Sequence, residues 1–170
     1  MTRGPRLATR RLYLEPLSLQ QCTTYLLGAR EGQPWAPDFP TDGDLRQAHI
    51  LSHNPDRAVS VNNPWGPYTL TERVTQLCIG GIGFKGSPDS AGVVEIGYGI
   101  CASRQNRGFM SEAVARLSEL ARDEGAFALS AETDAQNVAS QRVLEKCGFV
   151  RLSQESGSIW WRLELFPSLP

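Results

Sequence analysis

The sequence predicts an α/β fold in which a mixed, mostly antiparallel sheet is flanked by helices. Two observations carry this prediction. Short apolar or alternating runs typical of strands occur along the whole chain, and between them lie segments whose apolar residues recur every three or four positions, as in helices. With 170 residues, the chain is predicted to form a single domain over residues 1–170, because two ordinary domains would need a longer chain.

Each predicted element has a local signal. Strands are predicted where polar and apolar residues alternate or where β-branched and aromatic residues cluster. Helices are predicted where a capping residue such as Ser18 precedes an amphipathic run, and where a glycine such as Gly28 ends it. In chain order the prediction gives a strand at 11–15, helices at 18–28 and 41–53, strands at 68–72, 76–84 and 93–101, a helix at 109–125, a strand at 127–131, a helix at 137–148, and strands at 150–154 and 159–166.

Burial is predicted from the same spacing. The loop at 30–40 contains glycine and several prolines around Trp35 and Phe39, a composition that resists regular structure and predicts exposed aromatic side chains. The inward face is predicted to hold Ala113, Leu117, Leu120 and Ala121 on the third helix and Ala139, Val143, Leu144 and Cys147 on the fourth, and Phe127 to Ala131 is predicted to be a short buried strand.

The balance of 17 basic against 18 acidic residues gives no electrostatic reason to expect a nucleic-acid or membrane partner, and neither is predicted. Arginines crowd the N-terminus as they do in some targeting segments, but the apolar run that follows, 12–17, is short and is broken by Glu15 and Pro16. No signal peptide or membrane span is therefore predicted. The arginines are Arg3, Arg6, Arg10 and Arg11.

The four cysteines are widely spaced and include no CxxC pair. This spacing fits reduced thiols in a cytoplasmic protein better than a disulfide framework or a zinc site. His49 and His53 share one face of a predicted helix, but no third ligand is evident, so no metal is predicted. The cysteines are Cys22, Cys78, Cys101 and Cys147.

The segment 104–113 is the most informative part of the chain, because it follows an apolar strand and opens an amphipathic helix. A glycine-bearing turn at this place leaves backbone N–H groups unpaired at the positive end of the helix dipole, and such a turn suits a pyrophosphate. Taken alone, the turn is equally typical of an ordinary strand-to-helix connection in which Gly108 supplies an unusual backbone angle.

The turn resembles motif A of the GNAT N-acetyltransferase superfamily, Gln/Arg-x-x-Gly-x-Gly/Ala, with Gln105, Gly108 and Met110 at the three defined positions. Met110 departs from the motif by its bulk, although its backbone N–H is retained. Three more segments are similar to signatures of the RimJ/RimL branch, the ribosomal-protein N-terminal acetyltransferases. The resemblance covers most of the chain and implies the GNAT fold, with a sheet that splays at the glycine-bearing strand. The segments are 7–17, 94–99 and 137–149.

The resemblance implies acetyl-CoA as cosubstrate, with its pyrophosphate on the backbone of 105–110 and its pantetheine arm along Ile100 and Cys101. Cys101 is not expected to be a nucleophile, because no histidine lies close in sequence and the family transfers the acetyl group directly. Asn137 is well suited to cap a helix and by resemblance also contacts the pantetheine. The implied cofactor-binding residues are Ile100, Cys101, Gln105, Asn106, Arg107, Gly108, Phe109, Met110, Asn137 and Ser140.

Acetyl transfer from a thioester to an amine needs a held donor, a neutral amine and a proton for the departing thiolate. Strand alternation places Glu95 on one face with Gly97 and Gly99, beside a trough without side chains. Glu95 is predicted to be the general base, acting through water, and the alternative is a strand glutamate paired with an arginine. Ser140 is implied to assist the thiolate, because Leu144 stands where many relatives have a tyrosine.

Trp35 and Phe39, together with Glu95, are predicted to contact the acceptor. Trp160 and Trp161 are further candidates, although adjacent strand residues point to opposite faces. The predicted function is acetyl transfer to a primary amine, either a protein N-terminus or a small molecule. The alternative is a non-catalytic CoA-binding or sensor module. Near-neutral charge disfavours a polyamine unless Asp38, Asp42 and Asp44 form an acidic patch, and a homodimer is left open.

Overall fold

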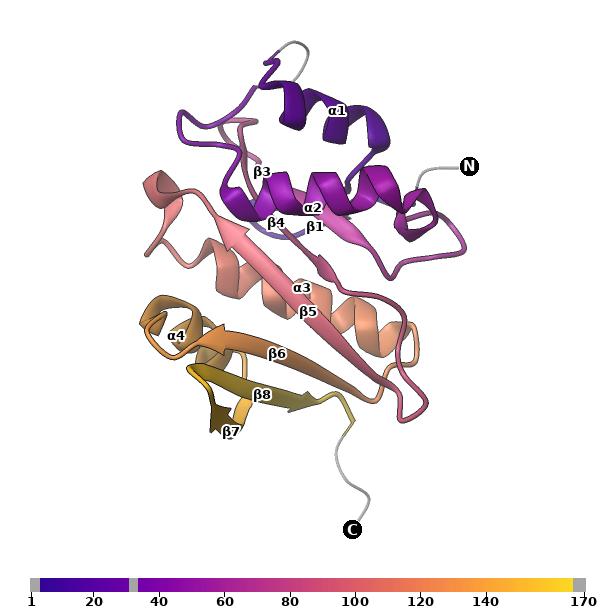
Figure 1. Cartoon of the computed structure of the whole chain (residues 1–170), viewed down its shortest axis with the longest axis vertical. Helices are drawn as coiled ribbons and strands as arrows, with labels where there is room; N and C mark the ends of the chain where they lie inside the picture. The colour runs from indigo at the N-terminus through magenta and orange to yellow at the C-terminus, as the bar shows by residue number, and fades with distance from the viewer. Residues whose placement is uncertain (1–3, 31–33, 167–170) are drawn as a thin grey trace.

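The computed structural model describes residues 4–30 and 34–166, so Arg3 and Gly32 lie outside it. Within these ranges the chain forms one sheet in the order β1-β2-β3-β4-β5-β6-β8-β7, with helices on both sides (Figure 1). All neighbouring strands are antiparallel except β5 and β6. The elements are β1 Leu7–Ala8, β2 Leu12–Pro16, α1 Leu19–Leu27, α2 Asp42–His53, η1 Pro55–Arg57, β3 Pro67–Glu72, β4 Cys78–Phe84, β5 Val93–Ile100, η2 Ala102–Arg104, α3 Phe109–Asp123, β6 Ala128–Asp134, α4 Val138–Lys146, β7 Val150–Glu155 and β8 Ser158–Glu164.

Local capping explains where the first two helices begin. Ser18 caps α1 and Thr41 caps α2, and each forms a reciprocal capping box, with Gln21 and Asp44 respectively. Gly28 ends α1 in the left-handed conformation, in which a glycine has no side-chain clash. The predicted bounds of these two helices are confirmed because their signals lie within a few residues of each end.

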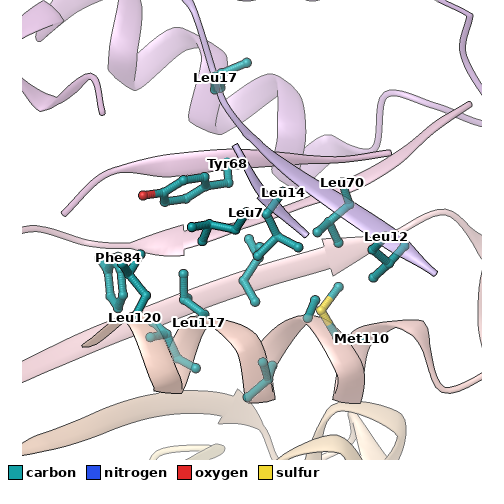
Figure 2. Close-up of a cluster of buried hydrophobic side chains, with 14 of the residues drawn as sticks. Leu7, Leu12, Leu14, Leu17, Tyr68, Leu70, Phe84, Met110, Leu117 and Leu120 are labelled. Carbon is teal, nitrogen blue, oxygen red and sulfur yellow. The ribbon is translucent and has the colours of Figure 1, made fainter. Parts of the chain in front are cut away.

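The main core lies between the sheet and α3, which packs against β2, β4, β5 and β6. Figure 2 shows leucines of β2 and β3 meeting residues of α3 in this layer. The inward face predicted for α3 is confirmed, since all four of its residues are buried. On the opposite side, α1 packs on α2, and α2 packs on β4 and β5. The core residues labelled in Figure 2 include Leu12, Leu14, Leu70, Met110, Leu117 and Leu120.

Three burial predictions are wrong. Phe127 is 61% exposed and contacts the ring of Phe166, because β6 begins one residue later than predicted. Ala139 is exposed, and of the four residues predicted to face inward on α4, only Leu144 is fully buried. The short strand β1 was not predicted as a separate element, and it pairs with β2 across a tight turn.

Trp35 and Phe39 are the third error, because both are buried rather than exposed. Their rings pack edge to face with each other and with Tyr25, at centroid distances of 5.0–5.5 Å. The loop that carries them is also held by backbone hydrogen bonds to Cys78 at the start of β4. Composition indicated an irregular loop, and it did not reveal that tertiary contacts fold this loop inward.

Facing glycines make one side of β4 and β5 bare. Gly81 pairs with Gly99 and Gly83 pairs with Gly97, and the register between the two strands is regular, so the predicted alternation holds. The pairing of β5 with β6 ends at Ile96 and Ala131, although both strands continue. The sheet therefore splays at the glycine-bearing strand as predicted, and the bare face lies beside α2.

The glycines of this face differ in how much room they have. A Cβ on Gly83 would lie 2.7 Å from backbone atoms of Gly66 and Pro67, whereas a Cβ on Gly97 would meet only the Lys85 side chain, at 3.5 Å. We expect Gly83→Ala to lower the melting temperature by about 4 °C or more, since overpacking costs about 1–3 kcal/mol and about 1 kcal/mol shifts a chain of this size by roughly 2–4 °C. Gly97→Ala is the matched control and should melt within about 2 °C of wild type. Equal losses in the two variants, measured by calorimetry, would contradict this packing.

Candidate functional site

Two cavities of about 530 and 550 Å³ meet beside the bare strand face. The first, the trough cavity, is lined by Gly81, Gly83, Gly97 and Gly99 of the sheet and by Gly43 and Asp44 of α2. The second, the loop cavity, lies where β5 ends and where α3 and α4 begin, and it is lined by residues that include Gln105, Gly108, Asn137 and Ser140. Gly43, Tyr98 and Gly99 line both cavities, so these residues mark the passage between them.

The loop cavity contains the uncapped start of a helix. Gly108 precedes α3 in the left-handed conformation, with φ +76°, and no side chain caps this terminus. The other three described α-helices are capped by Ser18, Thr41 and Asn137. The Glu112 N–H donates to the Gly108 carbonyl, and the N–H groups before it have no preceding turn to bond. These donors at the positive end of the dipole suit an anion such as a phosphate.

Glu112 fastens this helix start to the N-terminal strand. Its carboxylate accepts hydrogen bonds from the Thr9 hydroxyl at 2.5 Å and from the Arg11 backbone and Nε at 2.7 Å. Partial burial alone would raise the pKa of Glu112, but the bonds from Thr9 and Arg11 outweigh it and lower the pKa. Arg11 also donates to the Arg107 carbonyl at 2.9 Å, so it clamps the loop from outside.

A second carboxylate, Glu72 at the end of β3, holds the loop from the other side. Arg104 Nε lies 3.2 Å from Glu72 and Arg107 lies 3.7 Å from it. Burial alone would raise the pKa of Glu72, but hydrogen bonds from Thr75 and Arg104 outweigh it and lower the pKa. Arg107 therefore helps to shape the loop, and it is not among the residues that line the loop cavity.

The bulk of Met110 does not fill the loop. Its side chain is buried in the core layer between α3 and the sheet, where Figure 2 shows it close to Leu12. Phe109 is buried as well, with Arg11 and Arg107 over its ring. The departure of Met110 from the family motif is thus accommodated inside the protein, and its backbone stays on the cavity wall.

The structure brings most of the predicted cofactor residues together and separates Cys101 from them. Ile100 lines the loop cavity, whereas the Cys101 N–H donates to the Ile79 carbonyl at 2.9 Å and its thiol is fully buried. Burial raises the pKa of Cys101 to about 12, so the thiol is protonated and unreactive at neutral pH. The predicted residues on the cavity wall are Ile100, Gln105, Asn106, Gly108, Phe109, Met110, Asn137 and Ser140.

Tyr98 is a site residue that sequence reasoning missed. Its hydroxyl lies 2.9 Å from Ser140 Oγ and 3.2 Å from the Ser140 carbonyl, at the passage between the cavities. Burial raises the pKa of Tyr98 to about 12, so the phenol keeps its proton at neutral pH. Position 144 holds leucine and not tyrosine, but Tyr98 of β5 brings a phenol to Ser140.

Basic residues around the loop cavity were also missed. Arg142 and Lys146 line it from α4, one helical turn apart, and Arg104 lines it from the loop. Their spacing after the predicted Asn137 could have identified them, because residues at i and i+4 share a helix face. The cavity therefore combines free helix donors with positive side chains.

Glu95 lies on the predicted face, but it is ion-paired with Lys85 and not with an arginine. Its side chain is 27% exposed, and it is not among the residues that line either cavity. Gly99 at the passage is four residues further along β5, roughly 13 Å away at the usual rise of a strand. The predicted role of Glu95 as general base stays a prediction. At this distance, a proton from an amine at the passage would reach Glu95 only through intervening water.

The three aspartates named as a possible acidic patch have different surroundings. Asp38 accepts hydrogen bonds from the Ser103 N–H at 2.9 Å and hydroxyl at 2.5 Å, which lower its pKa. Asp42 is exposed, whereas Asp44 is buried in the trough cavity wall. Burial raises the pKa of Asp44 despite hydrogen bonds from Thr41. Sequence reasoning named Asp44 only as a member of a possible acidic patch, and it could not foresee that Gly81 makes room for its carboxylate.

The predicted aromatic residues stand behind the trough cavity. Trp35 and Phe39 do not line it, but they pack against Tyr25, which does. Trp161 is buried and donates to Thr133 Oγ1 at 2.9 Å, while Trp160 lies half-buried on the opposite face, as strand alternation requires. Contact of these aromatics with an acceptor stays a prediction.

Comparison with known families fits this geometry. Residues 11–150 match the family described as "Acetyltransferase (GNAT) domain". The chain belongs to this family. The predicted GNAT fold, with its splayed sheet and its glycine-bearing turn before α3, is thereby confirmed. No helix in the described part of this GNAT protein has the length and apolar character needed to cross a membrane.

The GNAT protein is similar to "Uncharacterized N-acetyltransferase YjdG" of Bacillus subtilis, with 37% identity over 73 residues that cover 42% of this chain and 44% of that protein. The match thus spans less than half of this curated relative. Similar solved structures include the "Ribosomal-protein-S5-alanine Acetyltransferase" of Vibrio fischeri, with a TM-score of 0.67, 14% identity and coverage of 98% of this chain and 100% of that chain.

Two further GNAT structures are similar and contain ligands. RimJ of Mycobacterium smegmatis in complex with CoA-disulfide has a TM-score of 0.65 and 17% identity, over 96% of this chain and 87% of that one. The microcin C7 self immunity acetyltransferase MccE, in complex with acetyl-CoA and AMP, has a TM-score of 0.63 and 14% identity, over 92% and 93%. At these identities the likeness shows the fold.

Proposed function

We propose that this GNAT protein is an acetyl-CoA-dependent N-acetyltransferase that passes the acetyl group directly to a primary amine. The observation that carries the proposal is the meeting of two cavities at Gly43, Tyr98 and Gly99. One cavity ends on an uncapped helix start flanked by basic residues, which suits the phosphates of CoA. The other has the facing glycines of β4 and β5 in its wall, which leaves room for an acceptor.

The splayed strand gives the pantetheine arm its place in this proposal. Beyond Ile96, β5 has no pairing with β6, so the backbone of 97–100 is available to an extended ligand. A thioester lying along it would reach the passage at Gly99. There the amine nitrogen attacks the thioester carbon, the C–N bond forms, and the C–S bond breaks to release a thiolate.

Ser140 and Tyr98 would serve the leaving group. The Ser140 hydroxyl is hydrogen-bonded to the Tyr98 phenol, and Tyr98 lines the passage while Ser140 lines the loop cavity. The serine proton passes to the thiolate, the phenol proton replaces it, and solvent water returns a proton to the phenol. Because a free thiol is already a good leaving group, this relay assists the reaction without controlling it.

Glu95 remains our proposed general base. It shares the bare face with Gly97 and Gly99, and the Lys85 ammonium forms an ion pair with it. Water along the glycine trough would carry the amine proton to it. Sequence analysis left open that Glu95 serves only as an ion-pair partner. The Glu95→Gln variant described below distinguishes that structural role from the role of general base.

Two features favoured a non-catalytic CoA-binding module, namely Met110 and the missing tyrosine. Met110 is packed in the core and Tyr98 supplies a phenol at the passage, so neither feature now favours that reading. Protein N-termini and small-molecule amines both remain open as acceptors. Release of free thiol from acetyl-CoA with a panel of amines tests the proposed function, because a sensor module would bind CoA without turnover.

We expect Gly108→Val to weaken CoA binding at least 10-fold, because a branched side chain at φ +76° distorts the turn that presents the N–H donors. Gly125→Val is the control, since Gly125 has φ +84° at the far end of α3 and open space around it. Both variants should lose stability, and only the first should lose affinity in calorimetric titrations. Alanine replaces valine at both positions if the valine variants do not fold. Equal CoA affinity for a folded Gly108 variant and wild type would refute the pyrophosphate placement.

We expect Glu95→Gln to lower kcat by roughly 10²-fold at neutral pH, with acetyl-CoA affinity unchanged, because glutamine keeps the size of the side chain and removes its basicity. Raising the pH should partly restore the rate, since more acceptor then arrives deprotonated. The measurement is a pH–rate profile of both proteins. Overlapping profiles would leave Glu95 with its structural ion pair to Lys85 alone.

Ser140→Ala should lower kcat by about 10-fold or less, since general-acid help is worth about 10²–10⁴-fold in full and the thiolate needs only part of it. Tyr98→Phe should give a similar loss, and the double variant should lose little more than either single variant, because the two hydroxyls act as one hydrogen-bonded pair. Multiplicative losses in steady-state kinetics would show that they act separately.

A further inference from the structure

Among the described residues, the side-chain hydrogen bonds of Asp44 all go to one of its two oxygens. The side chain is buried, with 8% of the residue exposed. Oδ2 accepts the Thr41 backbone N–H at 2.9 Å and the Thr41 hydroxyl at 2.7 Å, which completes the cap of α2. Oδ1 lies against Gly81, whose Cβ, if present, would come within 2.7 Å of it. Glycine at this position thus makes room for a carboxylate oxygen on the wall of the trough cavity.

In the described part of the chain, no basic side chain is paired with this carboxylate. Titratable groups approach it from each packed element, namely Tyr25 of α1, Cys78 of β4 and Cys101 after β5, and none of them is a cation. Across the described residues, no ion pair joins Asp44 to a basic side chain. A buried carboxylate without a paired cation is costly, and a helix cap alone does not require the carboxylate to lie on a cavity wall.

Basic residues do line the same cavity, but they are placed away from Asp44. Lys85 is already paired with Glu95, and Arg57 donates to the carbonyl of Lys85, the residue that follows β4. Arg46 is exposed. In the described structure, none of these three basic residues is ion-paired with Asp44.

Asp44 also lies beside the passage between the cavities. Gly43, its neighbour in α2, lines both of them, and a Cβ on Gly99 would come within 3.7 Å of Thr41 Oγ1. We infer that Asp44 anchors the ammonium group of the incoming acceptor and so selects acceptors that arrive as cations, an inference that rests on the proposed N-acetyltransferase function. The ammonium supplies the cation that the protein lacks at this point, and Oδ1 holds the nitrogen beside the thioester before its proton is removed.

The test compares two acceptors of similar size and different charge. Propylamine is cationic at pH 7, since its pKa is close to that of lysine, whereas acetohydrazide is a neutral nucleophile at that pH. Asp44→Asn removes the charge and keeps an oxygen that can accept from Thr41. We expect it to lower kcat/KM for propylamine about 10- to 100-fold, mainly through KM, with less than about a threefold change for acetohydrazide. Equal losses for both acceptors would overturn the inference and give Asp44 a structural role.

Asp42→Asn is the matched control, because Asp42 is an exposed carboxylate in the same first turn of α2. It should leave the propylamine to acetohydrazide ratio unchanged. A ratio shifted equally by both variants would trace the effect to the general field of the helix and overturn the inference. If wild type turns over neither acceptor, the proposed function fails for these amines, and calorimetry of propylammonium binding to the CoA complex then decides on Asp44. Binding to wild type and its loss in Asp44→Asn would support the anchor, and equal binding to both would refute it.

Thermal melts provide a readout that the acceptor does not affect. Burial raises the pKa of Asp44 above its ordinary value of 3.8, so the folded chain binds this proton more tightly than the unfolded chain. Stability is then fully present below pH 3.8 and falls as the pH rises through the raised pKa. Asp44→Asn should therefore melt higher than wild type at pH 7, by a margin that shrinks toward pH 4. A variant that melts lower than wild type at pH 7 would show that the charge is already compensated and would overturn the inference.

Discussion

The two glycine pairs across β4 and β5 are the constraint on which the site depends. Gly81 with Gly99 and Gly83 with Gly97 strip one face of the sheet, and glycine in strand interiors weakens a sheet because it has no side chain to pack. The opposite face offsets this loss, since Ile82 and Ile96 are buried against α3 and the strands keep a regular register. One pair of strands thereby acts as core on one side and as a cavity wall on the other.

Ion pairs and charge-assisted hydrogen bonds fix the shape of the loop before α3 and leave its backbone N–H groups exposed. Glu72 at the end of β3 and Glu112 in the first turn of α3 hold arginines by charge-assisted hydrogen bonds. Arg107 is thus engaged in fixing the turn, while the N–H groups at the start of α3 stay open. A ligand phosphate would meet donors that are already oriented, so little ordering would remain to be done on binding.

Sequence reasoning succeeded where a signal is local. The caps of α1 and α2, the alternation in β5 and the glycine before α3 each depend on a few neighbouring residues, and the structure confirms them. It failed where distant segments decide the outcome. Trp35 is buried because its loop pairs with β4, and Tyr98 meets Ser140 because α4 crosses the end of β5. Neither contact leaves a pattern within one segment, so composition gave the wrong exposure for Trp35 and no role for Tyr98.

Glu95 and Asp44, the two carboxylates near the trough, differ in their surroundings, and this difference suits them to different roles. Glu95 has a cation beside it at all times, so its charge is compensated whether or not a substrate is present. Asp44 has no paired cation among the described residues, so its charge is compensated only when a cation enters the cavity. A group of the second kind favours binding of a cationic acceptor, because the energy of the empty site is raised. Binding would thus be linked to an ammonium beside Asp44, and proton removal would follow through water toward the paired carboxylate. A protein that had only the ion-paired Glu95 would not bind a cationic acceptor in preference to a neutral one.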